Sequence, residues 1–322
     1  MKTTEKRAAL FEGIVTEVTG ASYLVTSGDE GVSRCRTFAG TKTENEDSSL
    51  VAVGDRVSVK PTDSGSDMHE GVITMVHRRH SVLERKRDVR RNRSKEKVQV
   101  IAANLDLLVV VVSALEPPLS PRLIDRYLVF AESEQLDALI VVNKMDLEDT
   151  DETRQTMQLY ETLGYRVLFT SSMDPVSILA LREALAGKIA AFSGHSGVGK
   201  STLINQLIGT DRLKTGETSM KSGKGVHTTS SAVMESLPGG GFVIDTPGIR
   251  EFNLSGITRD NLRFYFREFS RFLPDCTYSS CTHTVEPGCG VMRALEAGYI
   301  DSSRYDSYLL LHDSIDDENR TA

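Results

Sequence analysis

The chain has 322 residues, of which 39% are hydrophobic and 26% are charged, a composition typical of globular proteins with two or three domains. No apolar run approaches the ~20 residues that cross a bilayer, and residues 1–11 lack the apolar stretch of a secretory signal. We therefore expect a cytoplasmic protein with no membrane contact. The net charge of −7 argues against indiscriminate binding of nucleic acid, and four cysteines are too few for a disulfide scaffold.

Residues 11–76 contain short β-strand patterns that are separated by turn residues. The five runs are FEGIVTEV, ASYLVT, VSRCRTF, DRVSVKP and EGVITMV. Five such strands predict a small barrel of the OB-fold type, while another small β-barrel stays open as the alternative. We assign residues 1–83 to this domain and expect Cys35 to be an ordinary buried side chain.

The next stretch, residues 84–97, holds eight basic and three acidic residues. A solvated linker is the simplest interpretation, and contact with nucleic-acid phosphates is the alternative. We assign residues 84–100 to this basic linker.

Residues 101–254 alternate between strand and helix patterns. Strand-like runs such as LLVVVVS, ALIVVNK and KIAAFSG are separated by helical segments such as PRLIDRYLVFAESEQ. The alternation predicts a parallel, doubly wound α/β sheet. Residues 255–322 are more helical and polar, contain a cysteine-rich insert and end in an acidic tail.

The nine residues GHSGVGKST match the phosphate-loop pattern GxxxxGK[ST] and lie between a predicted strand and a predicted helix. Backbone N–H groups of such a loop surround a phosphate, Lys200 neutralises its charge, and the Ser201 hydroxyl is a ligand for Mg²⁺. A glycine-rich helix start without a ligand is the alternative. We predict phosphate contacts from Gly194, His195, Ser196, Gly197, Val198, Gly199, Lys200, Ser201 and Thr202.

The motif VVNKMD supplies Asn143, Lys144 and Asp146 at the end of a predicted strand. A carboxylate there can accept from both N1–H and the 2-amino group of guanine, whereas adenine offers neither donor, so GTP or GDP is favoured over ATP. Lys144 can cover the base and Asn143 can reach the phosphate loop. Backbone N–H groups of Ser171 and Ser172 are candidates for contact with guanine O6. The alternative is a strand end followed by a capped helix.

The motif VIDTPG supplies Asp245 for the Mg²⁺ shell and Gly248 for the γ-phosphate. Residues 214–230, which precede this strand, form a glycine-containing loop. Such a loop is suited to ordering around the γ-phosphate and Mg²⁺ through the hydroxyl of Thr228 or Thr229. A surface loop without function is the alternative.

The order of these motifs differs from that of ordinary GTPases. In those proteins the phosphate loop comes first and the NKxD and serine motifs come last, whereas here NKMD and TSS precede GHSGVGKS and DTPG. Circular permutation explains this order, because the same sheet forms when the old termini are joined and the chain is opened elsewhere. The segment after DTPG is then tethered to the part of the site that contacts the γ-phosphate.

Cys276, Cys281, His283 and Cys289 lie within 14 residues. Three thiolates and one imidazole are a complete tetrahedral set for one structural Zn²⁺, with no open position for a catalytic water. A single cysteine here would more often belong to the core, but four ligands together favour a metal.

The permuted order, the HTT that follows KSGKG, and the Cys-x4-Cys-x-His-x5-Cys cluster followed by RYDSYLLL resemble the RsgA (YjeQ) family of GTPases that depend on the small ribosomal subunit. The resemblance covers residues 11–312. It implies a GTPase that acts late in maturation of the small (30S) subunit, binds its rRNA near the decoding region and leaves after hydrolysis. It assigns the phosphate loop, the guanine motif and the zinc ligands as above, and makes Thr229 the switch threonine. Val226 and Met220 depart from the family pattern, in which basic and acidic residues are expected.

We expect the barrel, the basic linker and the zinc domain to face RNA, and the protein to be a monomer. Because only Phe11, Tyr23 and Phe38 offer aromatic rings on the barrel, phosphate contacts are favoured over base stacking. The expected phosphate contacts come from Arg85, Lys86, Arg87, Arg90, Arg91 and Arg93. A nucleotide-switched RNA-binding scaffold with incidental hydrolysis is the alternative, whereas a P-loop kinase would leave NKMD and the zinc site unexplained.

Ile249 follows the DTPG glycine, where many GTPases carry the glutamine that orients the attacking water. Isoleucine cannot do this, so we predict that His227, next to the switch threonines, acts in catalysis together with Lys200 and Thr229. The alternative is that His227 forms only structural or rRNA contacts and that the ribosome supplies the catalytic group.

Overall fold

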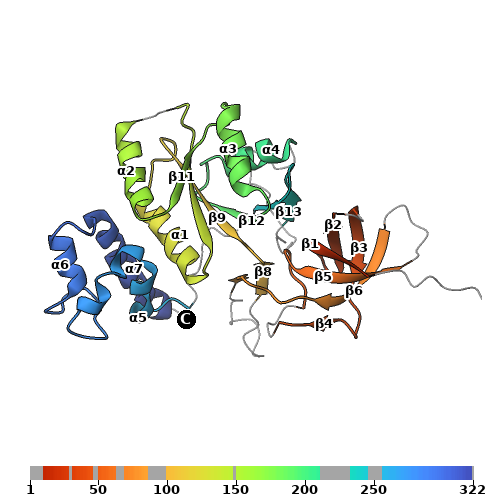
Figure 1. Cartoon of the computed structure of the whole chain (residues 1–322), viewed down its shortest axis with the longest axis horizontal. Coiled ribbons are helices and arrows are strands. Elements are labelled where there is room, and N and C mark those ends of the chain that lie inside the picture. The colour runs from red at the N-terminus through yellow and green to blue at the C-terminus, as the bar shows by residue number, and fades with distance from the viewer. Residues whose placement is uncertain are drawn as a thin grey trace, which may run out of the picture.

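The computed structural model describes residues 10–28, 31–45, 50–62, 69–85, 99–147, 150–210, 233–245 and 256–320. Three structural parts follow one another along the chain, a barrel, a central α/β domain and a helical domain (Figure 1). Within these ranges no helix is long and apolar enough to cross a membrane. The boundaries proposed above for the domains stay predictions.

The first part is a closed five-stranded barrel. Its strands are β1 (Phe11–Thr19), β2 (Ser22–Ser27), β3 (Gly31–Arg36), β5 (Arg56–Thr62) and β6 (His69–Val76). They pair in the order β3-β2-β1-β5-β6, and β3 also pairs with β6, which closes the barrel. Val15, Val25, Val59 and Ile73 fill the interior. Cys35 is fully buried among them, and burial raises the pKa of its thiol to about 11. The predicted five-stranded barrel is therefore confirmed.

Three short strands lie outside the predicted five. The two-residue strand β4 (Lys42–Thr43) pairs with the end of β6. At the two ends of the predicted linker, β7 (Val82–Arg85) and β8 (Gln99–Ala103) pair antiparallel. Their pairing brings residue 85 next to residue 99, so the basic stretch leaves and re-enters the fold at one place.

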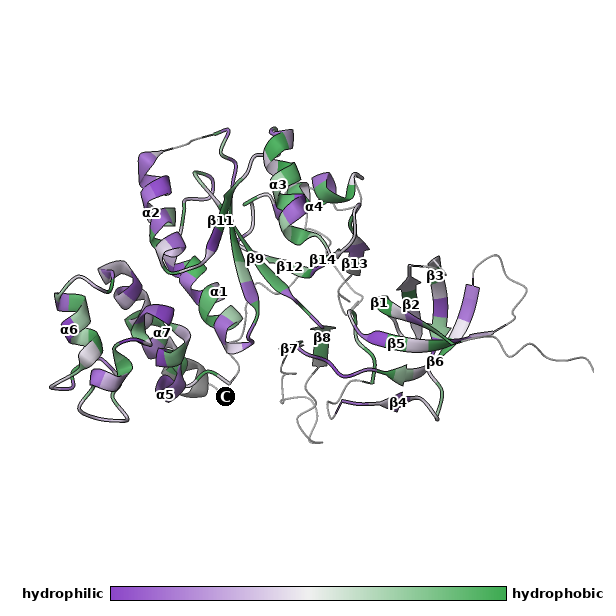
Figure 2. Ribbon diagram, in the orientation of Figure 1, coloured by the Kyte–Doolittle hydropathy of each residue, from purple (hydrophilic) through white to green (hydrophobic). Residues whose placement is uncertain are grey.

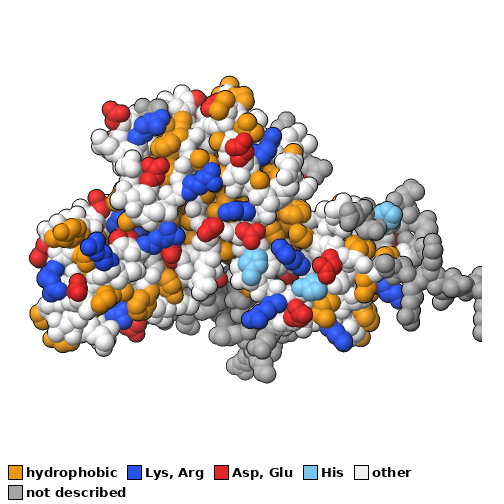
Figure 3. Space-filling view, viewed as in Figure 1, with side chains coloured by type: hydrophobic (Ala, Val, Ile, Leu, Met, Phe, Trp, Pro, Cys, Tyr) orange, Lys and Arg blue, Asp and Glu red, His pale blue; other side chains and the backbone are white. Residues whose placement is uncertain are grey.

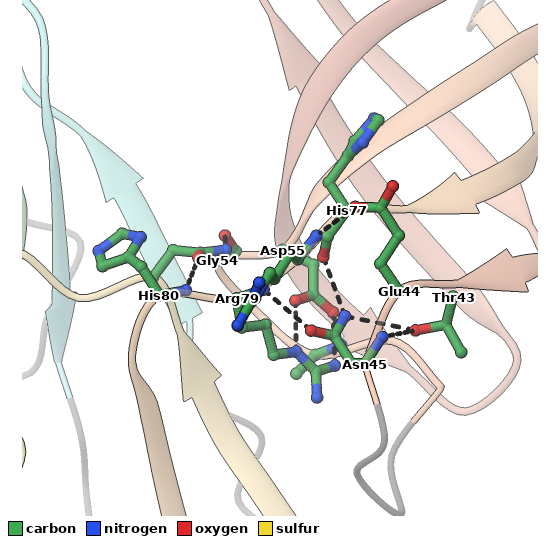
Figure 4. Close-up of polar contacts among 11 residues, drawn as sticks. Thr43, Glu44, Asn45, Gly54, Asp55, His77, Arg79 and His80 are labelled. Carbon is green, nitrogen blue, oxygen red and sulfur yellow. Dashed lines mark hydrogen bonds and ion pairs between the residues drawn. The ribbon is translucent and has the colours of Figure 1, made fainter.

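Buried polar contacts fasten the barrel to the central domain (Figure 4). Arg79 donates to both carboxylate oxygens of Asp55, at 2.7 and 2.8 Å, and both side chains are almost completely buried. Asn104 donates through Nδ2 to the Gly54 carbonyl at 2.9 Å and accepts from the His80 N–H at 3.1 Å. Each buried polar group in this junction thus has a partner, as a stable interior requires.

A second set of contacts in Figure 4 holds the segment after β4 against the segment after β6. Asn45 donates through Nδ2 to the His77 carbonyl and accepts from the Arg79 N–H, both at 2.9 Å. The Asn45 side-chain amide therefore bonds the backbone of residues 77 and 79 as a neighbouring strand would. These bonds hold the chain in place just before it enters the central domain.

The central domain contains a six-stranded sheet in the order β11-β10-β9-β12-β14-β13. The first five of these strands are parallel and β13 pairs antiparallel at one edge. The strands are β9 (Leu107–Ser113), β10 (Asp137–Asn143), β11 (Arg166–Phe169), β12 (Ile189–Ser193), β13 (Val233–Ser236) and β14 (Phe242–Asp245). Every residue of β9 is buried, which explains its continuous apolar run, and Figure 2 shows this strand mostly green. The predicted doubly wound α/β sheet is confirmed.

Helices cover both faces of the sheet. These are α1 (Pro121–Ser133), α2 (Asp151–Thr162), α3 (Pro175–Leu185) and α4 (Lys200–Ile208). Buried side chains of α1 and α2 pack on one face, and those of α3 and α4 on the other. Local signals set the helix starts: a proline occupies the first turn of α1 and α3, and Thr150 caps α2 by accepting the Thr153 N–H.

The sheet explains how a permuted chain forms an ordinary nucleotide fold. The chain runs outward from β9 through β10 to β11 and then returns to β12 on the other side of β9. From β12 it passes to β13 at the edge of the sheet and comes back to β14, which lies between β12 and β13. The connections after β9 and β12 thus depart in opposite directions. In open α/β sheets, ligands bind outside the carboxyl ends of the strands at such a switch point.

The C-terminal part consists of short helices packed around aromatic side chains. It contains α5 (Arg259–Leu262), α6 (Gly290–Glu296), α7 (Ser302–Arg320) and the 3-10 turns η3 (Arg263–Tyr265), η4 (Arg267–Phe269) and η5 (Leu273–Asp275). The rings of Phe266, Phe269 and Tyr308 lie 5.0 to 5.3 Å apart between centroids. Helix α7 packs beside α1 of the central domain (Figure 1).

Candidate functional site

The phosphate loop lies at the carboxyl end of β12, in the middle of the sheet. Gly194 has a φ of 145°, and a Cβ atom on it would lie 2.0 Å from the Val111 carbonyl oxygen. Gly199 has a φ of 93°, and its Cβ would lie 2.4 Å from Nδ2 of Asn143. Neither position has room for a side chain, because the loop approaches the backbone of β9 at Gly194 and the Asn143 side chain at Gly199.

Lys200 is the first residue of α4 and reaches back over the loop. Its Nζ donates to the carbonyls of Gly194 at 2.7 Å and His195 at 2.8 Å. The ammonium group is therefore held above the loop, where a bound phosphate would compete for it. Ser201 and Thr202 follow in the first turn of α4 and are half-buried, so a lysine and two hydroxyl residues lie together at the start of this helix, as the phosphate-loop pattern predicts.

Asn143 joins the guanine motif to the phosphate loop. It ends β10 and is 2% exposed. Its Nδ2 donates to the Val198 carbonyl at 2.9 Å, and its Oδ1 accepts from the Thr170 hydroxyl at 3.2 Å. Thr170 was missed by the sequence analysis, although a hydroxyl residue directly before the two serines at a strand end was a usable signal.

Asp146 and the serine loop meet beside this asparagine. The Ser171 hydroxyl donates to Asp146 Oδ1 at 2.5 Å, and the Ser171 N–H donates to the Ser177 hydroxyl at 3.2 Å. The Ser171 N–H thus has a partner inside the protein. Contact of the Ser171 and Ser172 N–H groups with guanine O6 stays a prediction. Lys144 has a φ of 63°, and its ammonium donates to the Glu116 carbonyl.

The remaining nucleotide residues predicted from the sequence lie largely outside the described residues. These are His227, Thr228, Thr229, Gly248 and Ile249, together with Met220 and Val226. Of Asp245 only the backbone is described. Asp245 ends β14 and pairs with Phe192 of β12, which lies two residues before the phosphate loop. In the basic linker, Lys86, Arg87, Arg90, Arg91 and Arg93 also lie outside the described residues, and of Arg85 only the backbone is described.

The cysteine-rich insert forms a compact candidate metal centre. The ligand atoms of Cys276, Cys281, His283 and Cys289 all lie within 4.8 Å of one another, and the last three residues are buried. Nδ1 of His283 is 3.6 Å from Cys276 Sγ and 3.3 Å from Cys289 Sγ, so Nδ1 is the ring nitrogen that faces these sulfurs. Burial raises the pKa of the Cys281 thiol to about 12 and lowers the pKa of His283 to about 4.

Side chains of the surrounding helices hold the backbone of this insert. Tyr305 donates to the His283 carbonyl, and Tyr308 to the Thr282 carbonyl, each at 2.6 Å. Backbone N–H groups also donate to two of the cysteine sulfurs, from Gly290 to Cys276 at 3.3 Å and from Met292 to Cys289 at 3.4 Å. Such donors stabilise thiolates, and outer contacts of this kind orient metal ligands.

Glu286 organises the turn inside the insert. Its carboxylate accepts from the N–H and the hydroxyl of Thr282, both at 2.6 Å, and from the N–H groups of Thr284 and Val285 at 3.1 and 3.2 Å. Burial alone would raise the pKa of Glu286, but these hydrogen bonds outweigh it and lower the pKa to about 2. Sequence analysis did not identify Glu286, Tyr305 or Tyr308 as supports of the site.

Comparison with known proteins agrees with this geometry. A family model described as RsgA GTPase matches residues 82–255. A protein of Chlorobaculum parvum, named small ribosomal subunit biogenesis GTPase RsgA, is 60% identical over 305 residues, which cover 95% of this chain and 98% of that protein.

Two crystal structures share the fold over nearly the whole chain. YloQ, described as a circularly permuted GTPase, has a TM-score of 0.74 and 26% identity, with 98% of this chain and 99% of that chain covered. YjeQ from Thermotoga maritima has a TM-score of 0.73 and 32% identity, with 95% and 99% covered. Because the family model and the relatives match the segments that form the phosphate loop, the guanine motif and the permuted sheet, the chain belongs to the RsgA GTPase family.

Proposed function

We propose that this chain hydrolyses GTP to GDP and phosphate as a late maturation factor of the small ribosomal subunit. The observation that carries the proposal is the hydrogen bond from Asn143 to Val198, which joins an NKMD motif to a phosphate loop at the carboxyl ends of the central strands. The name of the Chlorobaculum parvum relative supports the biological role.

In this proposal the guanine base lies between Lys144 and the serine loop. Asp146 accepts from N1–H and the 2-amino group, and the Ser172 N–H donates to O6. The fixed contact between Ser171 and Asp146 supports this arrangement, because a carboxylate held in one orientation can accept two parallel hydrogen bonds. Lys200 and the backbone of residues 194–202 bind the phosphates.

Mg²⁺ bound with the nucleotide would neutralise charge that develops on the phosphates. Ser201, Thr229 and Asp245 are the residues that would hold it, and the half-buried Ser201 in the first turn of α4 fits this role. His227 orients the attacking water, since Ile249 cannot. One Zn²⁺ in the Cys276 cluster is structural, because four protein ligands leave no open position.

We further propose that the barrel, the basic linker and the zinc domain contact rRNA near the decoding region, and that a monomer leaves after hydrolysis. On the face shown in Figure 3, the described Lys and Arg side chains are interspersed with Asp and Glu. This mixture argues against contact through a uniformly basic surface on that face. We assign the main phosphate contacts to the basic linker, because its sequence holds eight basic residues in 84–97.

Multiple-turnover hydrolysis, measured with and without small ribosomal subunits and with GTP or ATP, tests the proposal. We expect GTP to be the preferred substrate and the subunits to raise its turnover rate. Equal rates with and without subunits would favour a nucleotide-switched RNA-binding scaffold, and equal use of ATP would contradict the guanine assignment.

A further inference from the structure

The orientation of Asp146 depends on a residue outside the nucleotide motifs. Asp146 is exposed at the end of its loop, and a free carboxylate rotates broadly about its last bond. In the structure its Oδ1 accepts from the Ser171 hydroxyl, which holds the carboxylate in one orientation. The position of Ser171 therefore decides where the Asp146 oxygens point.

Ser171 is in turn held by Ser177, which lies in the first turn of α3. The Ser177 hydroxyl accepts from the Ser171 N–H at 3.2 Å and donates to the Asp174 carbonyl at 2.8 Å. A hydroxyl has one proton and two lone pairs, so it can make both contacts at once. Ser177 thus connects the serine loop to the start of a helix.

Helix α3 is a rigid support for this contact. Its residues Ile178, Leu181 and Leu185 are buried against the sheet. The Asp174 carboxylate caps the helix independently, by accepting from the N–H groups of Val176 and Ser177 at 3.0 and 3.3 Å. The helix start and the hold on Ser171 therefore use different atoms, and substitutions can separate them.

We propose that Ser177 is a positioning residue for guanine recognition, acting through Ser171 to fix the carboxylate of Asp146. The inference rests on the proposed binding of guanine by Asp146. It assigns the selectivity for the 2-amino group to a chain of three residues, linked through the backbone N–H and the hydroxyl of Ser171, rather than to the NKMD motif alone.

The test compares the dissociation constants of GDP and inosine diphosphate, which lacks the 2-amino group. The variants Ser177→Thr and Ser177→Val carry side chains of nearly the same shape as each other, but only threonine keeps the hydroxyl. We expect the wild-type protein and Ser177→Thr to bind GDP about tenfold or more tightly than inosine diphosphate. In Ser177→Val the preference for GDP over inosine diphosphate is expected to fall to about threefold or less, mainly through weaker binding of GDP.

Asp174→Ala is the control, because it removes the helix cap and leaves the carbonyl that Ser177 contacts. Its melting temperature is expected to fall while the nucleotide ratio stays at the wild-type value. An unchanged ratio in Ser177→Val, or an equal fall in Asp174→Ala, would overturn the inference. A wild-type protein that does not distinguish the two nucleotides would overturn the guanine assignment itself, and the inference with it.

Discussion

Gly199 lies where the phosphate loop meets the guanine motif. The side-chain amide of Asn143 occupies the space that a Cβ atom on Gly199 would need. Asn143 also bonds the neighbouring carbonyl of Val198, so the two loops share one contact point. A change of a single atom there acts on both halves of the nucleotide site.

Replacement of Gly199 by alanine should weaken GDP binding by about tenfold or more, because the new methyl group displaces Asn143 and the φ of 93° strains an L-residue. Gly209→Ala is the matched control, since Gly209 also has a positive φ, of 72°, but has open space around its Cβ position. Equilibrium binding of a fluorescent GDP analogue measures the effect. Equal losses in the two variants would show that strain, and not the displaced Asn143, is responsible.

Replacement of Asp146 by asparagine should exchange the base preference. The amide offers a donor that matches the C2 carbonyl of xanthine and no longer accepts from the 2-amino group of guanine. We expect the affinity for GDP to fall about tenfold and the affinity for xanthosine diphosphate to rise, as measured by competition binding. Asp151→Asn, which removes an exposed charge at the start of α2, should leave the preference unchanged. An unaltered preference in Asp146→Asn would contradict the role of NKMD.

At the scale of elements, a buried ion-pair network connects the central domain to the C-terminal part of the chain. Arg304 of α7 is 1% exposed and donates to Asp125 of α1 and, at 2.7 Å, to Glu268. Tyr160 of α2 donates to the same Asp125 carboxylate at 2.8 Å. Burial and the nearby Asp125 charge raise the pKa of Tyr160 far above its usual value, so the hydroxyl remains a donor. Three elements from two domains therefore share one carboxylate.

Removal of that carboxylate should destabilise the junction strongly. Asp125→Ala leaves Arg304 with Glu268 as its one remaining carboxylate partner among the described contacts, and loss of one member of a buried pair costs about 3 kcal/mol of unfolding free energy. Asp137→Ala breaks an exposed 3.4 Å pair with Lys188 and should cost less than about 1 kcal/mol. Denaturant titration compares the two variants. Similar values would mean that the buried network does not stabilise the junction.

The metal cluster should be required for the structure of the C-terminal part but not for nucleotide binding. Because the binding energy of a structural metal contributes directly to folding, Cys281→Ala should lose the zinc and increase hydrogen exchange across residues 256–320. The affinity for GDP should stay within about twofold of wild type, since these ligands lie outside the nucleotide site. Elemental analysis should find one zinc per wild-type chain purified without added metal; its absence would contradict the closed site.

At the scale of the whole molecule, the barrel lies next to the strand that follows the predicted switch segment. Strand β13 begins at residue 233 and lies beside β1 of the barrel (Figure 1). Met234 of β13 is 4% exposed in the core cluster against which Ile14 and Val18 of β1 pack. The segment 211–232 is therefore followed directly by a strand that packs against the barrel.

Motifs could be predicted from the sequence, whereas their supports could not. Asn143, Lys200 and the metal ligands occur at short, chemically specific spacings, and repeated apolar patterns predicted the barrel and the parallel sheet. Arg304 and Asp125 are separated by 179 residues, and Asn104 is separated from Gly54 by 50. Such pairs depend on how domains pack, and no local pattern encodes that. Ser177 is close in sequence but looks like an ordinary helix-start residue until its contact with Ser171 is seen.

The last prediction concerns His227, which we propose as a catalytic residue. Ile249 cannot orient water, and we propose that His227 does so instead. Because this role concerns hydrolysis and not binding, we expect His227→Ala to bind GTP and small subunits with affinities within about twofold of wild type. Its subunit-stimulated hydrolysis should fall by about 100-fold, the lower range for loss of a general acid–base group. His69→Ala removes an exposed imidazole from the barrel and is the control. Single-turnover rates, measured with small subunits in excess, separate the GTP hydrolysis step from product release. Wild-type stimulation in His227→Ala would assign the catalytic group to the ribosome.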